Sequence, residues 1–159
     1  MHSLGYRYSK GDYGLPINHT KALKLWQQAA KLGHTNAYYS IGCAYRNGRG
    51  VERDAKKAEH YCELAALGGC EKARYNLGAF EKRDGNHHRA LKHFMIAAGD
   101  GDHNSLKAIQ GYYMNGHATK EDYAKALRSY QAYLDEIRSD QRDEAAAARD
   151  EYKYYYSAF

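Results

Sequence analysis

The sequence is poor in proline and contains no long apolar run. Pro16 is the only proline, and valine and isoleucine are scarce, which disfavours a fold built from strands. No apolar stretch approaches the roughly 20 residues that cross a bilayer. The opening residues, MHSLGYRYSKG, lack the apolar centre of a secretory signal. We therefore expect neither a transmembrane helix nor a secreted protein.

The composition favours a helical protein. The chain has 159 residues, about the size of one ordinary domain. Hydrophobic residues make up 43% of it and charged residues 27%, and the 17 tyrosines and many alanines supply much of the hydrophobic share. Abundant alanine with little proline is typical of α-helices. We therefore expect an all-α fold.

Charge and cysteine content indicate the kind of partner and the cellular compartment. Lys and Arg outnumber Asp and Glu by 24 to 19, and the net charge of +5 favours acidic partners without selecting one. The three cysteines are Cys43, Cys62 and Cys70. An odd number of cysteines without a secretory signal is typical of reduced thiols in an intracellular protein. The expected location is the cytoplasm.

One pattern recurs along the chain. The strings KALKLWQQAAKLGHTNA, KAEHYCELAALGGCEKA and RALKHFMIAAGDGDHNS begin at residues 21, 57 and 89. Each contains an alanine, a bulky residue or cysteine four positions later, an Ala-Ala pair and a glycine. The bulky or thiol positions are Trp26, Cys62 and Phe94, and the glycines are Gly33, Gly69 and Gly101. At helical period these alanines and the large residue share one face. A fourth copy, which begins at residues 125–126, lacks the Ala-Ala pair.

A second pattern precedes each copy. Its apolar positions are Leu4, Ile41, Leu77 and Ile109, followed by glycine in all but the last. The repeating unit is thus a first helix, here called the A helix, a loop, and a second helix, the B helix. We expect the four apolar residues to face the partner helix and the glycines to let the two helices approach. Asp54 is an expected N-cap, and Thr119 with Asp122 an expected capping box.

Residues 37–69 carry the pattern most completely. They contain Ala37, Ile41, Gly42, Tyr45, Gly48, Gly50, Val51, Asp54, Lys57, Ala58, Ala65, Ala66 and Gly69. This spacing resembles the repeat of the Sel-like repeat family, which is related to the tetratricopeptide repeat. The resemblance covers about residues 1–134.

The resemblance implies an architecture. It is an α/α solenoid, a right-handed superhelix of about four helix-hairpin repeats at about residues 1–34, 35–69, 70–102 and 103–138. Residues 139–159 are rich in tyrosine and are expected to form a C-terminal capping helix, with a helix left free for a partner as the alternative. Because residue 1 already lies inside the motif, we expect the chain to be a piece of a longer array, with a short native start and a frayed first helix as the alternative.

The sequence offers no pattern for catalysis. It contains no G-x-S-x-G, no phosphate-binding glycine loop and no H-E-x-x-H. His87, His88 and His93 cluster in sequence but lack the matched spacing of a zinc site, so we expect no metal and no cofactor. Cys62 occupies the core position of Trp26 and Phe94, and all three cysteines are expected to be free thiols. The protein is therefore predicted not to be an enzyme.

The resemblance also places a binding surface, because A helices line the concave groove of tetratricopeptide-like arrays. The partner-binding residues predicted in this groove are Tyr6, Lys10, Asn36, Tyr39, Arg46, Asn47, Lys72, Tyr75, Lys82, Arg83, Asn104 and Lys107. Six of them are basic and none is acidic. Tyrosine is a favoured anchor at interfaces, and asparagine can bond to a peptide backbone.

Two functions remain open. The family resemblance implies a scaffold or adaptor that binds a segment of another protein, and the basic groove favours an acidic segment. The alternative is a single-stranded nucleic-acid binder that holds phosphates with the same cations and stacks bases on the tyrosines. Neither function involves a small-molecule substrate.

Overall fold

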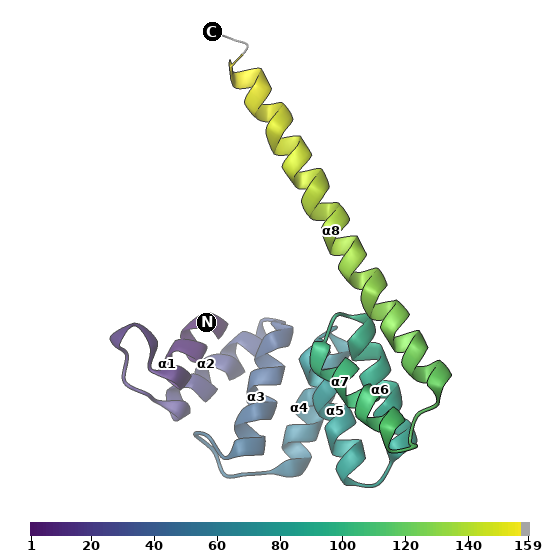
Figure 1. The fold of residues 1–159 in the computed structure, drawn as a ribbon. Coiled ribbons are helices and arrows are strands. Elements are labelled where there is room, and N and C mark those ends of the chain that lie inside the picture. Colours follow the sequence, from purple (N-terminus) through teal and green to yellow (C-terminus); the bar gives the residue numbers. More distant parts are fainter. Residues whose placement is uncertain (157–159) are drawn as a thin grey trace.

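The protein is an all-α array of helical hairpins (Figure 1). The structure, a computed structural model, describes residues 1–156, and it describes side chains through residue 141 and at residues 143, 144 and 147. The helices are α1 (His2–Lys10), α2 (His19–Lys31), α3 (Thr35–Asn47), α4 (Ala55–Leu67), α5 (Glu71–Arg83), α6 (His87–Gly99), α7 (His103–Met114) and α8 (Lys120–Tyr156), with a 3-10 turn η1 (Asp12–Gly14) after α1. The predicted α/α solenoid is confirmed, with α1, α3, α5 and α7 as its A helices.

The expected caps form where the sequence places them. The Asp54 carboxylate accepts a hydrogen bond from the backbone N–H of Lys57 at 2.9 Å and starts α4. Before α8, Thr119 Oγ1 accepts from the N–H of Asp122 at 3.1 Å, and the Asp122 carboxylate accepts from the N–H of Thr119 at 2.9 Å. This reciprocal pair is the predicted capping box.

Glycine sets the spacing between the helices of a hairpin. A Cβ atom at Gly5 would lie 2.5 Å from Trp26 Nε1, and one at Gly78 would lie 2.6 Å from Phe94 Cε1. At Gly42 the nearest atoms would be the Ala58 carbonyl oxygen and Cys62 Sγ, both at 3.1 Å. Three of the A helices, α1, α3 and α5, therefore pack directly against the large or thiol residue of their own B helix, as the recurring pattern predicts.

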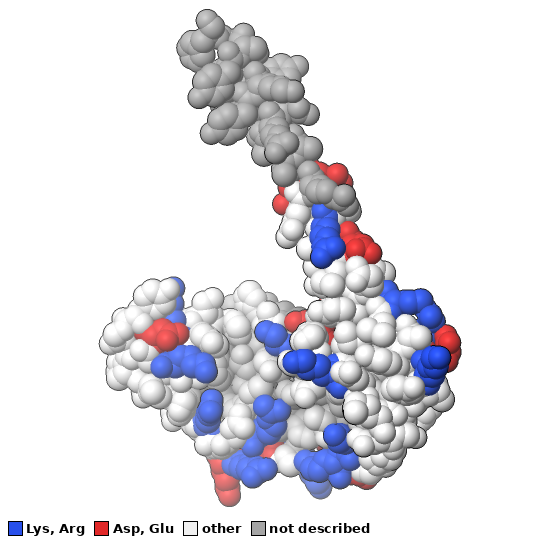
Figure 2. Space-filling model, viewed as in Figure 1, with Lys and Arg blue, Asp and Glu red and all other residues white. Residues whose placement is uncertain are grey.

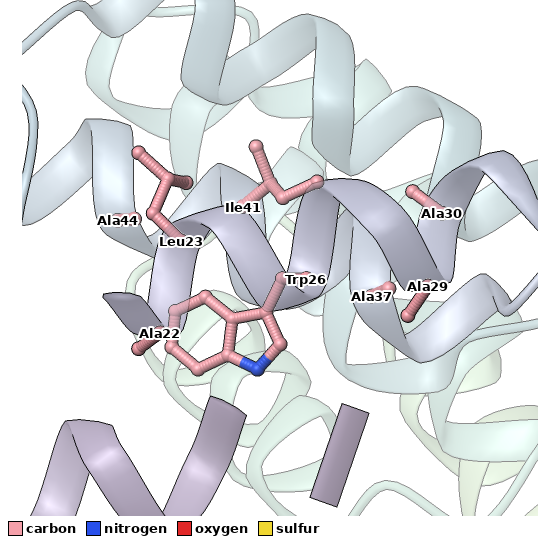
Figure 3. Packing of buried hydrophobic residues seen from close by; sticks show 8 residues of the cluster. All are labelled: Ala22, Leu23, Trp26, Ala29, Ala30, Ala37, Ile41 and Ala44. Atoms are coloured by element: carbon pink, nitrogen blue, oxygen red, sulfur yellow. The ribbon is translucent and has the colours of Figure 1, made fainter. Parts of the chain in front are cut away.

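The core continues from one hairpin to the next through the A-helix apolar position. Figure 3 shows Ile41 of α3 among Leu23, Trp26 and the alanines of α2. Ile41 is 1% exposed, whereas Leu4, its counterpart in α1, is 40% exposed. Leu4 is more exposed because, among the described residues, α1 packs mainly against α2, whereas α3 lies between α2 and α4.

The C-terminal segment does not form a separate helix. Residues 139–156 continue α8 without a break, because no glycine or proline interrupts the sequence after residue 119 and before residue 157. The early part of α8 packs against α6 and α7, and Figure 1 shows the rest running away from the array. The separate capping helix predicted at 139–159 is therefore corrected to a long extension of the fourth B helix. The tyrosine side chains of residues 152–156, and residues 157–159, lie outside what the structure describes.

Tyr133 makes the early part of α8 a cover for the array. A Cβ atom at Gly101, which has φ of 92°, would overlap the Tyr133 ring. The α8 helix thus seals the turn between α6 and α7 with an aromatic ring instead of the missing Ala-Ala pair. Within residues 1–156, none of the helices combines the length and the hydrophobicity that a membrane crossing requires.

The packing of the alanine pairs leads to a first prediction. Ala65 is fully buried in α4, so Ala65→Leu should overpack the second hairpin and lower the free energy of unfolding by about 1–3 kcal/mol. Ala55→Leu places the same side chain on an exposed position of the same helix and should change it by less than about 0.5 kcal/mol. Urea unfolding of both variants measures the difference, and equal stability would contradict the assigned B-helix face.

Candidate functional site

The twelve predicted partner-binding residues all lie on the A helices. Tyr6 and Lys10 belong to α1, the next four to α3, four more to α5, and Asn104 and Lys107 to α7. We call the face formed by α1, α3, α5 and α7 the A-helix surface. Figure 2 shows Lys and Arg side chains spread over one face of the array. The structure does not leave all twelve residues free, because some of them contact neighbouring repeats.

A cleft opens between the first two A helices. It has a volume of about 270 Å³ and is here called the α1–α3 cleft. Its lining residues are Tyr6, Ser9, Lys10, Trp26, Tyr39, Ser40, Cys43, Ala44, Asn47 and Arg49. Four of the predicted binding residues, Tyr6, Lys10, Tyr39 and Asn47, thus meet in one cavity. The aromatic residues and Ala44 give it apolar surface, and the remaining residues supply hydroxyl, amide, thiol and cationic groups.

The cleft exists because two serines occupy positions that are bridged at the next interface. Between α3 and α5, Arg46 Nη1 donates a hydrogen bond to Asn76 Oδ1 at 2.9 Å. Counted from the A-helix glycines, Ser9 and Ser40 hold the equivalent positions between α1 and α3. Serine side chains are too short to make the same bridge across the two helices. The space that Arg46 and Asn76 fill in one interface is therefore open in the other.

The third interface is closed by a different contact. Lys82 of α5 occupies the position equivalent to Arg46, and its ammonium lies 5.7 Å from the centre of the Tyr112 ring of α7. This distance is within the range of a cation–π contact. Lys82 is therefore partly engaged by the protein itself, although its side chain is exposed.

The two arginines predicted to bind a partner have different surroundings. Arg46 is half-buried and holds the amide of Asn76, which is 4% exposed. Arg83 is exposed and pairs with its neighbour Asp84, Nε to Oδ1, at 2.8 Å. This pairing lowers the pKa of the Asp84 carboxyl and raises that of the Arg83 guanidinium. Arg46 thus acts as a connection between repeats, and Arg83 has a carboxylate partner of its own.

The three predicted tyrosines also differ. Tyr6 is 50% exposed, and Lys10 Nζ lies 6.0 Å from the centre of its ring. Tyr39 is half-buried at the cleft, where burial and the neighbouring Cys43 raise the pKa of its phenol. Tyr75 is partly buried against Phe94, with ring centres 5.6 Å apart. Tyr6 and Tyr39 therefore offer ring surface to a ligand, whereas Tyr75 belongs largely to the core.

The remaining predicted residues are exposed polar groups on α3, α5 and α7. Asn36, Lys72, Asn104 and Lys107 all have exposed side chains. Within the part of the chain that the structure describes, Lys10, Lys72 and Lys107 have no ion pair, unlike Arg83. These three lysines are the predicted cations that stay available to a partner.

Sequence reasoning missed Arg49, which lines the cleft from the loop after α3. Gly48 and Gly50 on either side of it have φ values of 67° and 74°. The sequence pattern interprets this Gly-Arg-Gly segment only as a turn. The sequence could have indicated Arg49, since it stands between two turn glycines directly after an A helix. A turn at this point places the arginine beside the end of that helix.

A buried carboxylate was also missed. Glu81, where other repeats have tyrosine, is 8% exposed and pairs with Arg89 Nη2 at 2.8 Å. Asn86 Nδ2 donates a second hydrogen bond to the same carboxylate at 2.8 Å. Glu81 thus connects α5 to the start of α6 across the loop at residues 84–86, and it is bound within the hairpin instead of facing a partner.

The described residues contain no group of His, Cys, Asp and Glu side chains arranged to hold a metal ion. His87 stacks on His117 with ring centres 4.0 Å apart, and its Nδ1 lies 3.4 Å from the Tyr112 hydroxyl. These rings pack at the start of α6 beside Tyr112. Cys43, Cys62 and Cys70 are all free thiols, as predicted, and Cys62 is 1% exposed in the core.

The repeat identifies the family to which the chain belongs. The model of the Sel1 repeat matches residues 1–34, 35–70 and 111–131, which together make up more than half of the chain. The chain belongs to the Sel1 repeat family. Proteins built from Sel1 repeats are generally protein-interaction scaffolds, and this agrees with the adaptor class that the sequence predicts.

Curated relatives match about half of this chain. Protein SHC1 of Saccharomyces cerevisiae is 36% identical over 77 residues, which are 48% of this chain and 15% of that protein. Chitin synthase regulator SKT5 of the same organism is 34% identical over 73 residues, 46% of this chain and 10% of that protein. The similarity therefore concerns a small part of each of these longer proteins.

Solved structures share the fold over most of the chain. A Sel1 repeat protein from Oxalobacter formigenes superposes with a TM-score of 0.67 and 26% identity, covering 87% of this chain and 57% of that one. The protective antigen c5321 of uropathogenic Escherichia coli, which has an SLR fold, gives 0.69 and 31%, covering 85% and 30%. Both similarities support the Sel1 hairpin array.

The bridge between α3 and α5 gives a prediction. Arg46→Ala removes the only donor that the structure shows for the buried Asn76 Oδ1, and it should lower the free energy of unfolding by about 1–3 kcal/mol. Arg83→Ala removes an exposed arginine from the same surface and should change the free energy of unfolding much less. Urea unfolding compares the two, and an Arg46 variant as stable as the Arg83 variant would rule out the bridge.

Thiol reactivity gives a second prediction. Cys43 lines the cleft, whereas burial raises the pKa of Cys62 to about 12 and also raises the pKa of Cys70. Because the thiolate is the reactive form, iodoacetamide should modify Cys43 first and the other two only after unfolding. Peptide mass spectrometry over time measures the order. Modification of Cys62 before Cys43 would contradict the packing described above.

Proposed function

We propose that the protein is a non-enzymatic scaffold that binds an acidic segment of a partner protein on its A-helix surface. The α1–α3 cleft is the observation that carries this proposal. It combines two tyrosine rings with Lys10 and Arg49, whose cations can pair with carboxylates beside it. A partner segment with a bulky side chain next to acidic residues fits both properties.

The size of the cleft supports a single anchor. Its volume of about 270 Å³ is below the roughly 300–1,000 Å³ of pockets that enclose whole small-molecule ligands. One partner side chain between Tyr6 and Tyr39 suits this volume. The rest of the segment then lies along the A-helix surface, where Asn36 and Asn104 are exposed and can bond to its backbone.

The charge of this surface supports an acidic partner. Lys72 of α5 and Lys107 of α7 add two exposed cations to Lys10 of α1 on the A helices. A partner segment that crosses the A helices can meet more than one of these lysines. Arg46 and Arg83 contribute less than the sequence predicts, because Arg46 is half-buried and bonded to Asn76 and Arg83 is paired with Asp84.

We propose that the protein is located in the cytoplasm. Three free thiols, two of them buried, suit a reducing compartment. The regulator named among the relatives is consistent with a role that does not require catalysis, although this chain spans only 10% of its length.

The sequence alternative, single-stranded nucleic acid, uses the same cations and the rings of Tyr6 and Tyr39. The two functions differ in what the cleft must hold. An acidic protein segment places carboxylates beside the cations, whereas nucleic acid stacks its bases on the aromatic rings and places phosphates beside the cations. Binding of nucleic acid also weakens steeply as salt is raised.

The proposal predicts that charge beside the cleft decides binding. The probe is a fluorescently labelled peptide, EEYEEE, titrated by fluorescence anisotropy. Lys10→Glu with Arg49→Glu should weaken its binding at least tenfold, because both substitutions place negative charge beside the cleft. Melting temperature should change little, since Lys10 and Arg49 are exposed and have no ion pair in the described structure.

The matched control reverses two exposed lysines on B helices. Lys24→Glu with Lys92→Glu makes the same change in net charge on α2 and α6 and should alter peptide binding less than threefold. If both double variants lose the peptide equally, binding does not depend on the cleft. If an oligo(dT) strand binds the native protein more tightly than the peptide does, the nucleic-acid function replaces the proposal.

A further inference from the structure

We propose that the A-helix surface of one copy of this protein docks the acidic part of α8 from a second copy. This inference rests on the proposed function, since it identifies one acidic segment that the surface binds. The segment is residues 135–144 of α8, here called the acidic stretch. It contains Asp135, Glu136, Asp140, Asp143 and Glu144, all exposed, against Arg138 and Arg142.

The charges of the two parts of the chain are opposite. Residues 1–117 contain 17 Lys and Arg and 10 Asp and Glu, a net charge of +7, and residues 118–159 contain 7 and 9, a net charge of −2. Figure 2 shows Asp and Glu side chains on α8 where it leaves the array, and Lys and Arg side chains spread over the array itself. The chain thus carries both a cationic surface and an anionic helix.

The acidic stretch presents its carboxylates as a row. Glu136, Asp140 and Glu144 are spaced four residues apart and lie on one face of α8, at intervals of about 6 Å along the helix axis. Like charges at this spacing destabilise a helix. Cations close to the row reduce this repulsion, and the A-helix surface carries exposed lysines without an ion pair, among them Lys10, Lys72 and Lys107.

The geometry favours a second copy over the same chain. The beginning of α8 is fixed by its packing against α6 and α7, and the helix continues without a break to Tyr156. Figure 1 shows that this course takes the later part of α8 away from the array that carries it. A straight helix that leaves its own array is free to reach the array of another molecule.

Such docking is a head-to-tail contact, since different surfaces of the two copies meet. It generates either a closed ring or an open chain of molecules, and it becomes stronger with protein concentration. It also competes with an acidic partner for the same surface. Self-association would therefore hold the surface covered until a partner of higher affinity or concentration replaces α8.

The test is sedimentation velocity of the full chain over a range of concentrations. The α8 variant carries Glu136→Lys, Asp140→Lys and Glu144→Lys, which keeps the like-charge spacing of the row but reverses its sign. The array variant carries Lys10→Glu, Lys72→Glu and Lys107→Glu. We expect the native protein to form oligomers as its concentration rises, and each variant alone to remain monomeric.

Mixing the two variants gives the decisive measurement. The lysine row of the α8 variant then faces the acidic surface of the array variant, and the native α8 of the array variant faces the native surface of the other. Oligomers should return in the mixture. A control variant with Glu52→Lys, Glu63→Lys and Asp100→Lys changes the same net charge at exposed positions outside α8 and should associate at least as well as the native protein.

Several results would overturn the inference. A native protein that stays monomeric at every concentration, oligomers that persist in the α8 variant, or a mixture that fails to associate would each do so. Circular dichroism verifies that the variants keep their helix content, and Asp140→Lys alone serves as a milder version if the triple variant unfolds. Binding of the EEYEEE peptide separates the two proposals: if it binds a protein that never self-associates, the scaffold function stands and the α8 contact falls.

Discussion

The close approach of each A helix to its own B helix is the constraint on which the rest of the structure depends. It is possible because Gly5, Gly42 and Gly78 leave room for Trp26, Cys62 and Phe94. The pairing fixes the rotation of each A helix, and that rotation decides which side chains point outward. A binding surface on the A helices is thus a direct result of how tightly the hairpins close.

The interfaces between hairpins then decide where that surface is open. Arg46 and Asn76 connect α3 to α5, and Lys82 reaches the Tyr112 ring of α7. Only small hydroxyl groups stand at the corresponding place between α1 and α3, so a cavity remains there. A difference of a few atoms in side-chain length thus separates an interface that only holds the array together from one that has space for a ligand.

Much of this was predictable from the sequence, because a repeated spacing reports local packing. The alanine pairs, the A-helix glycines and the caps at Asp54 and Thr119 all act within one hairpin, and their pattern indicates their roles. The engagement of Arg46, the burial of Tyr75 and the position of Arg49 depend on neighbouring repeats or on a loop, which spacing alone does not show. The course of α8 was missed for a related reason: a helix-forming sequence tells where a helix forms but not whether it bends back.

The position of the cleft between two hairpins links ligand binding to the packing of the first hairpin against the second. Among the described residues, α1 and α2 contact the rest of the array mainly through α3, and in repeat arrays each hairpin is held folded largely by such nearest-neighbour contacts. A ligand in the cleft touches both α1 and α3 and so acts as an additional contact for the first hairpin. Its apparent affinity is then reduced by the fraction of molecules whose first hairpin is open. Sequence changes that alter only the stability of that hairpin would thereby tune the binding strength without touching a residue of the cleft.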